Sequence, residues 1–270
     1  MRSFQFAAVG DNCVDRFQTP VREAFAGGNA VNVAVQLTAL GCPTAYFGAI
    51  GDDADGRHIV DALSANSVNT DHVAIRPAVT AFTDIDITEA GERVFVVEEF
   101  GACRGYAPEP DELPVLVQMR HVHIGWLDDG GALRQALAQS GTSVSQDVSV
   151  NADPRNLDVT GLGIVFASAG SPDEARHMAA EFHRRGAALA VVTMGALGSL
   201  ASDGKEIVQI GIKPVDVVDT TGAGDSFIAG FIAARSREGG NLRVWLEAGR
   251  DAAAATCTHL GGFRQIPRRL

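Results

Sequence analysis

An alternation of short apolar runs with helix-like segments is the feature that most constrains the fold. Residues 4–9 and 44–50 form apolar runs of strand length, and helical spacing of apolar residues follows at 29–40 and 55–65. A short strand is predicted at 72–75. Strands joined through helices pair in parallel, and helices then cover both faces of their sheet. The sequence therefore predicts an α/β fold with a mainly parallel sheet.

One segment interrupts this alternation. Residues 80–88 alternate polar with apolar side chains, residues 89–92 have turn composition, and residues 93–99 resume a strand pattern. A hairpin with one polar face differs from the buried strands around it. We interpret it as a small β-sheet lid outside the main sheet. An antiparallel pair at the edge of the main sheet is the alternative.

The alternation resumes after a proline-rich turn and continues to the C-terminal region. A content of 46% hydrophobic residues is enough for one large core, so we predict a single domain over 1–270. The lid is assigned mainly to 80–100, with a contribution from about 11–24. The tail, 264–270, is expected to be loosely held. The later elements are strands at 122–125, 143–148, 164–167 and 189–193, a hairpin at 199–201 and 206–210, and helices at 132–139, 172–185, 223–235 and 242–259.

Charge and cysteine content exclude several classes of function. The net charge of −11 argues against nucleic acid or an anionic membrane as partner, although a small anionic ligand needs only local positive potential. The four cysteines form no C-x-x-C pair, which disfavours a zinc or redox site. No signal peptide pattern or membrane-length apolar run is present. These features predict a soluble cytoplasmic protein.

The stretch 219–231, Asp-Thr-Thr-Gly-Ala-Gly-Asp-Ser-Phe-Ile-Ala-Gly-Phe, carries the strongest chemical signal. The backbone N–H groups of Gly222, Ala223 and Gly224 can face an anion at the start of a helix. Asp225 follows in the first turn, where it could accept a proton. Donors for a phosphoryl oxygen beside a carboxylate are typical of a phosphotransferase. A glycine turn before an ordinary helix would have the same composition, so this stretch alone does not decide.

A second group of polar residues lies where the first strand ends and the first long helix begins. In open α/β sheets, ligands bind beyond the carboxyl ends of the strands. Carboxylates and amides at that edge can hold vicinal hydroxyl groups. Turn formation is the alternative, since Asp, Asn and Gly all favour turns. The residues concerned are Asp11, Asp15, Gly27, Gly28, Asn29 and Asn32.

Familiar nucleotide motifs are missing from the sequence. It contains no G-x-x-x-x-G-K-[ST] loop, and no G-x-G-x-x-G opens the first helix. The loop 193–199 contains Gly195 and Gly198 and could be a tight turn or a ligand-approach loop.

His121 and His123 lie two residues apart on a predicted strand, where they could share one face and bind a metal ion. No third ligand follows at a spacing typical of metal sites, which favours a structural role for both histidines.

Two signatures resemble those of the ribokinase-like (PfkB) family of carbohydrate kinases. The first is Gly-Gly-Asn-Ala-Val-Asn-Val-Ala at 27–34, with Gly41 and Gly51 following, and the second is the stretch 219–231. The similarity covers nearly the whole chain. Within the family, segments 10–15 and 25–35 resemble the fructoselysine 6-kinase branch most closely.

The resemblance implies a fold and a set of site residues. The fold would be a Rossmann-like three-layer sandwich with a β-sheet lid, with ATP bound by the C-terminal half and the sugar between sheet and lid. Asp225 would be the base, and the amides of Gly222, Ala223 and Gly224 the anion hole. Asp15, Gly28, Asn29 and Asn32 match positions that hold the sugar, and we add Asp11, Gly27 and Arg93 as candidates for the same site. Thr193, Gly195 and Gly198 match the nucleotide loop, and we add Ser168, Thr220, Gly222, Gly224 and His259 as candidates for nucleotide binding.

One motif of many family members is absent. Their N-x-x-E pattern helps to organise Mg²⁺, whereas residues 168–171 here read Ser-Ala-Gly-Ser, with Glu174 shortly after. ATP and Mg²⁺ are the expected cofactors, but the metal ligands are left open. A monovalent cation such as K⁺ is a further candidate that the sequence does not decide.

The expected activity is ATP-dependent phosphorylation of a primary hydroxyl group of fructoselysine or a related fructosamine. Arg93 could meet the carboxylate of such a substrate, and Glu98 or Glu99 its amine. A kinase for a plain sugar or nucleoside, and a catalytically silent sugar-binding protein, are the alternatives. Because exposed lid edges favour pairing between chains, we also expect a homodimer clasped through the lid strands.

Overall fold

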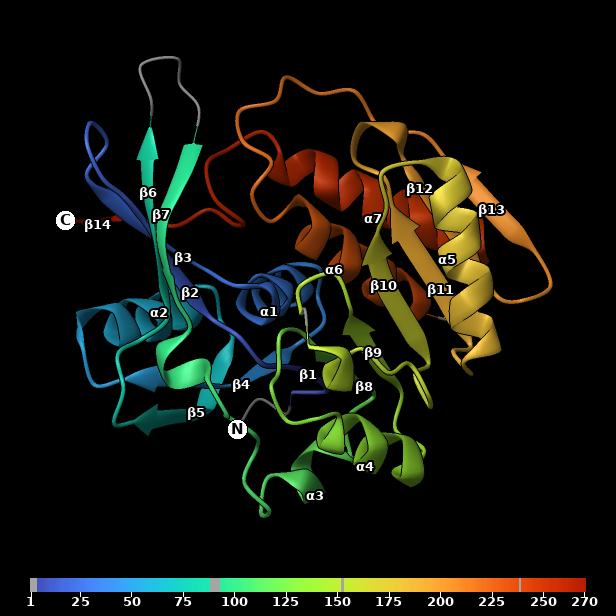
Figure 1. Cartoon of the computed structure of the whole chain (residues 1–270), viewed down its shortest axis with the longest axis horizontal. Coiled ribbons are helices and arrows are strands. Elements are labelled where there is room, and N and C mark those ends of the chain that lie inside the picture. The colour runs from blue at the N-terminus through green and yellow to red at the C-terminus, as the bar shows by residue number, and fades with distance from the viewer. Residues whose placement is uncertain (1–3, 88–92, 152, 238) are drawn as a thin grey trace.

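A computed structural model describes residues 4–87, 93–151, 153–237 and 239–270 (Figure 1). Within these residues, the largest element is a nine-stranded sheet. Six of the eight neighbouring strand pairs in this sheet are parallel, and only the two pairs at one edge are antiparallel. This confirms the mainly parallel sheet. The strand order is β13 (Ile207–Ile210), β12 (Ser199–Ser202), β11 (Leu189–Thr193), β10 (Ile164–Ser168), β9 (Val144–Asp147), β8 (His121–Ile124), β1 (Phe6–Val9), β4 (Thr44–Gly51) and β5 (Asn69–Arg76).

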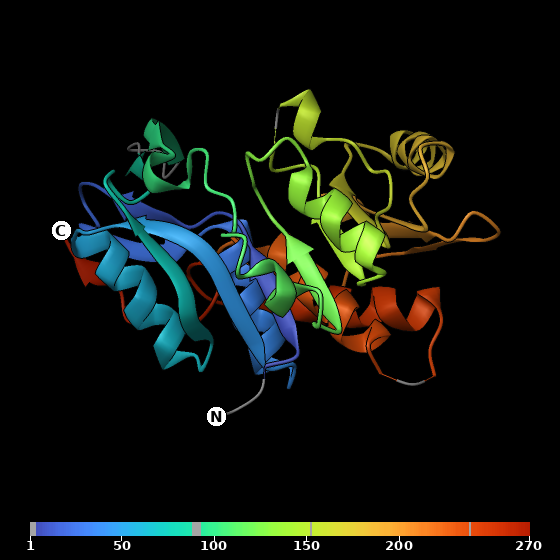
Figure 2. The ribbon, with the colours of Figure 1, turned by 90° about the horizontal axis from the view of Figure 1, so that it is seen from below.

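Helices cover both faces of this sheet (Figure 2). Successive side chains of β1 point to opposite faces, so Phe6 and Ala8 join one core while Ala7 and Val9 join the other. The first core is closed by α1 (Asn29–Ala39), α2 (Ala54–Ala65), α6 (Ala223–Arg235) and α7 (Leu242–Thr256). The second is closed by α3 (Leu113–Leu116), α4 (Ala132–Ser140) and α5 (Pro172–Arg184).

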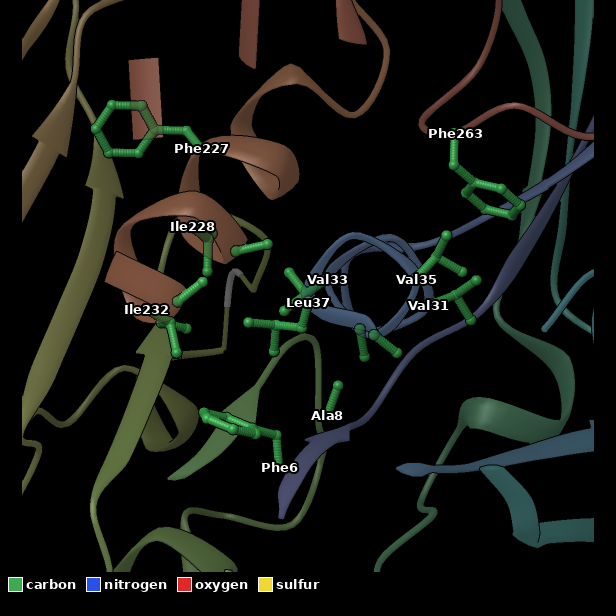
Figure 3. Close-up of a cluster of buried hydrophobic side chains, with 14 of the residues drawn as sticks. Phe6, Ala8, Val31, Val33, Val35, Leu37, Phe227, Ile228, Ile232 and Phe263 are labelled. Carbon is green, nitrogen blue, oxygen red and sulfur yellow. The ribbon is translucent and has the colours of Figure 1, made fainter. Parts of the chain in front are cut away.

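Helix α1 is the centre of the first core. Its sequence is almost entirely small and apolar, and most of its side chains are buried. In Figure 3, Leu37 and Val33 extend from α1 toward Ile228 of α6, while Ala8 of β1 lies beneath the helix. A helix that is buried around most of its circumference can present polar side chains only at its end. Its start is therefore where a site can form.

A second sheet of five strands occupies one side of the described structure (Figure 1). The hairpin predicted outside the main sheet is confirmed, although its turn at 89–92 lies outside the described residues. Strand pairing is antiparallel except between β2 and β6. That these strands act as a lid on a single domain stays a prediction. The order is β14 (Arg268–Arg269), β3 (Glu23–Gly27), β2 (Cys13–Phe17), β6 (Phe82–Ile87) and β7 (Arg93–Glu99).

The prediction of a loosely held C-terminal tail is wrong. Strand β14 pairs with β3, and the Gln265 side chain exchanges two hydrogen bonds with the backbone of Ala26, at 2.7 and 2.8 Å. Arg268 and Arg16 both form ion pairs with the buried carboxylate of Asp55. The tail is ordered because β3 offers it an open sheet edge and Asp55 needs positive partners.

The remaining differences from the predicted elements are small. Helix α7 ends at Thr256 and α5 at Arg184, before the predicted residues 259 and 185. Across the described residues, every helix is too short or too polar to cross a membrane.

Candidate active site

The starts of α1 and α6 are brought together by close backbone contact. Gly28, at the start of α1, has φ 101°, and a β-carbon there would lie 2.6 Å from Cα of Asn12. Gly222, at the start of α6, has φ 71°, and a β-carbon there would lie 2.4 Å from Cα of Gly262. Side chains are excluded at both positions by conformation and by space. The two glycines therefore let both helix starts reach one point.

Asp225 lies in the first turn of α6 and is held by two amides from α1. Its Oδ1 accepts a hydrogen bond from Nδ2 of Asn29, and its Oδ2 accepts one from Nδ2 of Asn32, both at 2.7 Å. Because each oxygen has its own donor, the plane of the carboxylate is fixed. The structure thus brings together three residues from two motifs that lie far apart in the sequence.

Burial raises the pKa of Asp225 to about 7. The negative charges of Asp147 and Asp11 raise it further, while the hydrogen bonds from Asn32 and Asn29 oppose the shift. At neutral pH about half of the protein would carry the ionised form. A proton acceptor is most effective when its pKa lies near the working pH.

Asp147 is a second buried carboxylate that sequence reasoning missed. It ends β9 and accepts hydrogen bonds from Nδ2 of Asn29 at 3.1 Å and from the backbone and hydroxyl of Ser149 at 2.9 and 2.6 Å. Burial raises its pKa to about 6. An acid at the carboxyl end of a parallel strand was the available signal, since the same rule selected Asp11.

The Asp11 carboxylate, predicted as a sugar ligand, makes several hydrogen bonds inside the protein. Its carboxylate accepts the backbone N–H groups of Asn29, Ala30 and Trp126, at 2.7, 3.2 and 2.9 Å. These contacts join the start of α1 to the segment that follows β8. Three of the carboxylate's acceptor positions are therefore used inside the protein, where they hold the site in shape.

Two of the expected sugar ligands, Asp15 and Asn32, lie beside Gly27 at the end of β3. A β-carbon on Gly27 would lie 3.7 Å from Oδ2 of Asp15 and 3.9 Å from Oδ1 of Asn32. Within the described part of the chain, Oδ1 of Asn32 is buried and has no hydrogen-bond partner. An unpaired buried acceptor is costly unless a ligand supplies the donor. The side-chain-free surface of Gly27 thus lies between two groups that suit hydroxyl binding.

A cavity of about 400 Å³ adjoins the start of α6. Of the predicted nucleotide residues, Thr193, Gly195, Gly198, Thr220 and Gly224 line it. Ser168, Gly222 and His259 are not among its lining residues: Ser168 bonds to the Thr193 hydroxyl, and His259 to the carbonyl of Leu260. Two cationic residues that the sequence did not single out complete the rim, namely Lys213 and Arg250.

The remaining candidates have weaker support in the structure. The side chain of Arg93 lies outside the described residues. Glu98 is exposed on β7, and Glu99 accepts the backbone N–H of Gly101 at 2.9 Å. Glu174 accepts the backbone N–H of Gly170 at 2.7 Å. The residues that the structure describes contain no group of three His, Cys, Asp or Glu side chains placed to hold a metal ion.

Comparisons with known proteins give the family and the relatives of this chain. The model of the pfkB family carbohydrate kinases matches residues 12–130 and 160–269. A fructoselysine 6-kinase of Shigella flexneri is 35% identical over 95% of this chain and 98% of its own. A fructosamine kinase of Bacillus subtilis is 30% identical over 95% of this chain and 92% of its own.

Solved structures show the same fold. The ribokinase of Arabidopsis thaliana, complexed with ribose and ATP, superimposes with a TM-score of 0.85 at 23% identity, covering 96% of this chain and 94% of the other. A ribokinase II from E. coli in complex with ATP and Mg²⁺ gives 0.79 at 20% identity, with coverages of 96% and 94%. From the family match, the relatives and the shared fold, this chain belongs to the pfkB family of carbohydrate kinases and is a sugar kinase.

Proposed function

We propose that the protein transfers the γ-phosphoryl group of ATP to the primary hydroxyl group at position 6 of fructoselysine or a related fructosamine. The observation that carries this proposal is the Asp225 carboxylate, fixed by Asn29 and Asn32 beside a cavity large enough for a nucleotide. The names of the relatives from Shigella flexneri and Bacillus subtilis support the substrate class.

In the proposed mechanism, Asp225 accepts the proton of the attacking hydroxyl group. With both oxygens oriented by amides, the carboxylate is aimed before the substrate arrives, which reduces the entropic part of the barrier. The N–H groups of Gly222, Ala223 and Gly224 would donate to the oxygens of the transferred phosphoryl group at the positive end of α6. Closure of the smaller sheet over the sugar would exclude water as a competing acceptor.

The lining of the cavity suits ATP. Apolar side chains such as Val215, Val217 and Phe227 offer surfaces for a nucleobase, and Lys213 and Arg250 add positive charge for the phosphates. No protein cage for a metal is found in the described residues. Mg²⁺ often binds through substrate phosphates and water rather than through an all-protein cage. It would arrive on the nucleotide and neutralise phosphate charge.

A substrate panel tests the proposal. ATP consumption would be measured with fructoselysine, other fructosamines, plain hexoses and nucleosides, and the phosphorylated carbon located by NMR. We expect the highest kcat/KM for a fructosamine and phosphate on carbon 6. A higher kcat/KM for a plain sugar or a nucleoside would reject the substrate assignment, and no turnover with any acceptor would favour a silent binding protein.

The raised pKa of Asp225 predicts how activity depends on pH. The group accepts a proton only when ionised, so kcat/KM should be constant above pH 8. It should fall about tenfold per pH unit below the pKa of about 7. Steady-state rates from pH 5 to 9, with stability checked at each pH, measure this acidic limb of the pH profile, in which kcat/KM falls. A limb centred near pH 4, where ordinary aspartates titrate, would contradict the assignment.

The smaller sheet supports the further proposal of a homodimer. Strand β7 lies at the edge of that sheet, and its Val94, Val96 and Val97 side chains are 46%, 55% and 44% exposed. An exposed apolar edge strand is a template for pairing with a second copy. Light scattering should give twice the monomer mass for the wild-type protein and the monomer mass for Val96→Lys. A monomeric wild-type protein at micromolar concentration would exclude the dimer.

We place the enzyme in the cytoplasm, where ATP is available.

A further inference from the structure

A chain of hydrogen-bonded polar side chains leads from the start of β9 to Asp225. It links two histidines of β8, Ser145 of the neighbouring strand β9 and Ser143 just before β9, and it reaches Asp225 through the amide of Asn29. Each step is within hydrogen-bond distance. The steps are Ser143 Oγ to His121 Nδ1 at 2.9 Å, His121 Nε2 to Ser145 Oγ at 2.8 Å, Ser145 Oγ to His123 Nδ1 at 2.9 Å, His123 Nε2 to Asn29 Oδ1 at 3.0 Å, and Asn29 Nδ2 to Asp225 Oδ1 at 2.7 Å.

The direction of every bond follows from the last one. Nδ2 of Asn29 donates to the carboxylates of Asp225 and Asp147, because an amide oxygen there would face two acceptors. Its Oδ1 must therefore accept, so His123 carries its proton on Nε2. The hydroxyl of Ser145 then donates to Nδ1 of His123 and accepts from Nε2 of His121. The same rule makes Ser143 a donor to His121, so all the donors point toward the carboxylates.

Strand register explains why these side chains meet. His123 on β8 lies directly beside Ser145 on β9, in a parallel pair that also aligns Val122 with Val144. Both histidines are buried, and burial lowers their pKa values to about 3. They are thus neutral at physiological pH, as the assigned tautomers require.

We infer that His123, supported by Ser145 and His121, is a positioning residue that locks the Asn29 amide and thereby orients the Asp225 carboxylate for proton abstraction. This role rests on the proposed function of Asp225. His123 touches neither substrate nor nucleotide in the mechanism above. It acts through Asn29: the two carboxylates hold Nδ2 of that amide and His123 holds its Oδ1, so without His123 the amide is held at one end only and can tilt away from Asp225.

The chain orients the carboxylate but does not conduct protons. A proton could pass along alternating hydroxyl and imidazole groups, but Asn29 interrupts that path, because a side-chain amide does not readily accept and release protons. Aligned donors polarise one another, so the chain strengthens the final bond to Asp225 as well as fixing its geometry.

Two substitutions of His123 separate positioning from packing. His123→Gln keeps a side-chain N–H that can reach Oδ1 of Asn29, whereas His123→Leu fills similar space without a donor. We expect His123→Leu to lower kcat roughly 10- to 100-fold, with the KM for ATP changed less than twofold. His123→Gln should keep kcat within about threefold of the wild type. Ser145→Ala, which removes one link at nearly constant size, should lower kcat in the same direction but less.

His183 supplies the matched control. It is a partly buried histidine bonded to the Ser202 hydroxyl at 2.9 Å and to the carbonyl of Ala187 at 3.0 Å, away from Asp225. His183→Leu should leave kcat at the wild-type level. If His123→Leu keeps wild-type kcat, or if His183→Leu lowers kcat as far as His123→Leu, the positioning role is rejected.

A second readout does not require catalysis. The carboxyl ¹³C signal of Asp225, identified by its loss in Asp225→Asn, would be titrated by NMR. Without the Asn29 donor, the pKa of Asp225 should rise by about half a unit or more in His123→Leu but not in His123→Gln. The charged groups that act on Asp225, namely Asp147 and Asp11, are unchanged in both variants. An unchanged titration in His123→Leu overturns the inference, even if the substrate panel fails.

Discussion

Replacing Asp225 by Asn should lower kcat by about 10²–10⁴-fold while leaving the affinity for ATP within twofold. An amide cannot take the proton of the attacking hydroxyl group, but it keeps the shape of the carboxylate. The fold should tolerate the change, because Asn32 has a buried Oδ1 without a partner in the described structure. Rotation of the Asn32 side-chain amide would let this oxygen accept a hydrogen bond from the amide N–H introduced at position 225.

Initial rates and calorimetric titration with ATP measure the two quantities separately. Asp203→Asn, in the exposed turn between β12 and β13, is the control for loss of one negative charge. If Asp225→Asn folds, binds sugar and keeps a third or more of the wild-type kcat, Asp225 is not the base.

Removal of the Asp11 side chain should have the largest effect on stability. In Asp11→Ala, the N–H groups of Asn29, Ala30 and Trp126 lose their acceptor at once. Hydrogen bonds to a charged group contribute about 1.5–3 kcal/mol each, and contributions that share one group are not additive. We expect the free energy of unfolding to fall by about 3 kcal/mol or more.

Denaturant titration measures this loss, and Asp11→Asn is the graded control. One acceptor oxygen remains in Asp11→Asn, so its loss of stability should be smaller than that of Asp11→Ala. The sequence alone suggested that Asp11 holds the sugar. Wild-type stability in Asp11→Ala, combined with a raised KM for the sugar, would support that role and contradict the structural one.

The sequence predicted those parts of the site that depend on local chemistry. Glycines 28 and 222 and the acid and amides that follow them are recognisable because backbone conformation and close approach restrict which residues fit. The same reasoning located the hairpin at 80–99, whose alternating side chains suit a half-exposed sheet. In these places the neighbouring residues determine the structure.

Other parts depend on contacts between distant segments and could not be predicted in this way. His123 meets Ser145 only through the register of β8 and β9, which no property of either strand specifies by itself. The ordered tail depends on Asp55, which is buried and needs cations. Lys213 lines the cavity beside α6 from an irregular loop whose path has no sequence signature.

The pairing of β14 with β3 has a consequence for synthesis of the protein. Gln265 meets Ala26 across 239 positions, and Asn29 meets Asp225 across 196. On the ribosome, β3 and the start of α1 therefore emerge long before their partners, with an open sheet edge and unpaired amides exposed. Contacts this distant in sequence form slowly. A nascent chain can form the contact between Asn29 and Asp225 only after residue 225 has left the exit tunnel, and it can cover the open edge of β3 only after β14 has left as well.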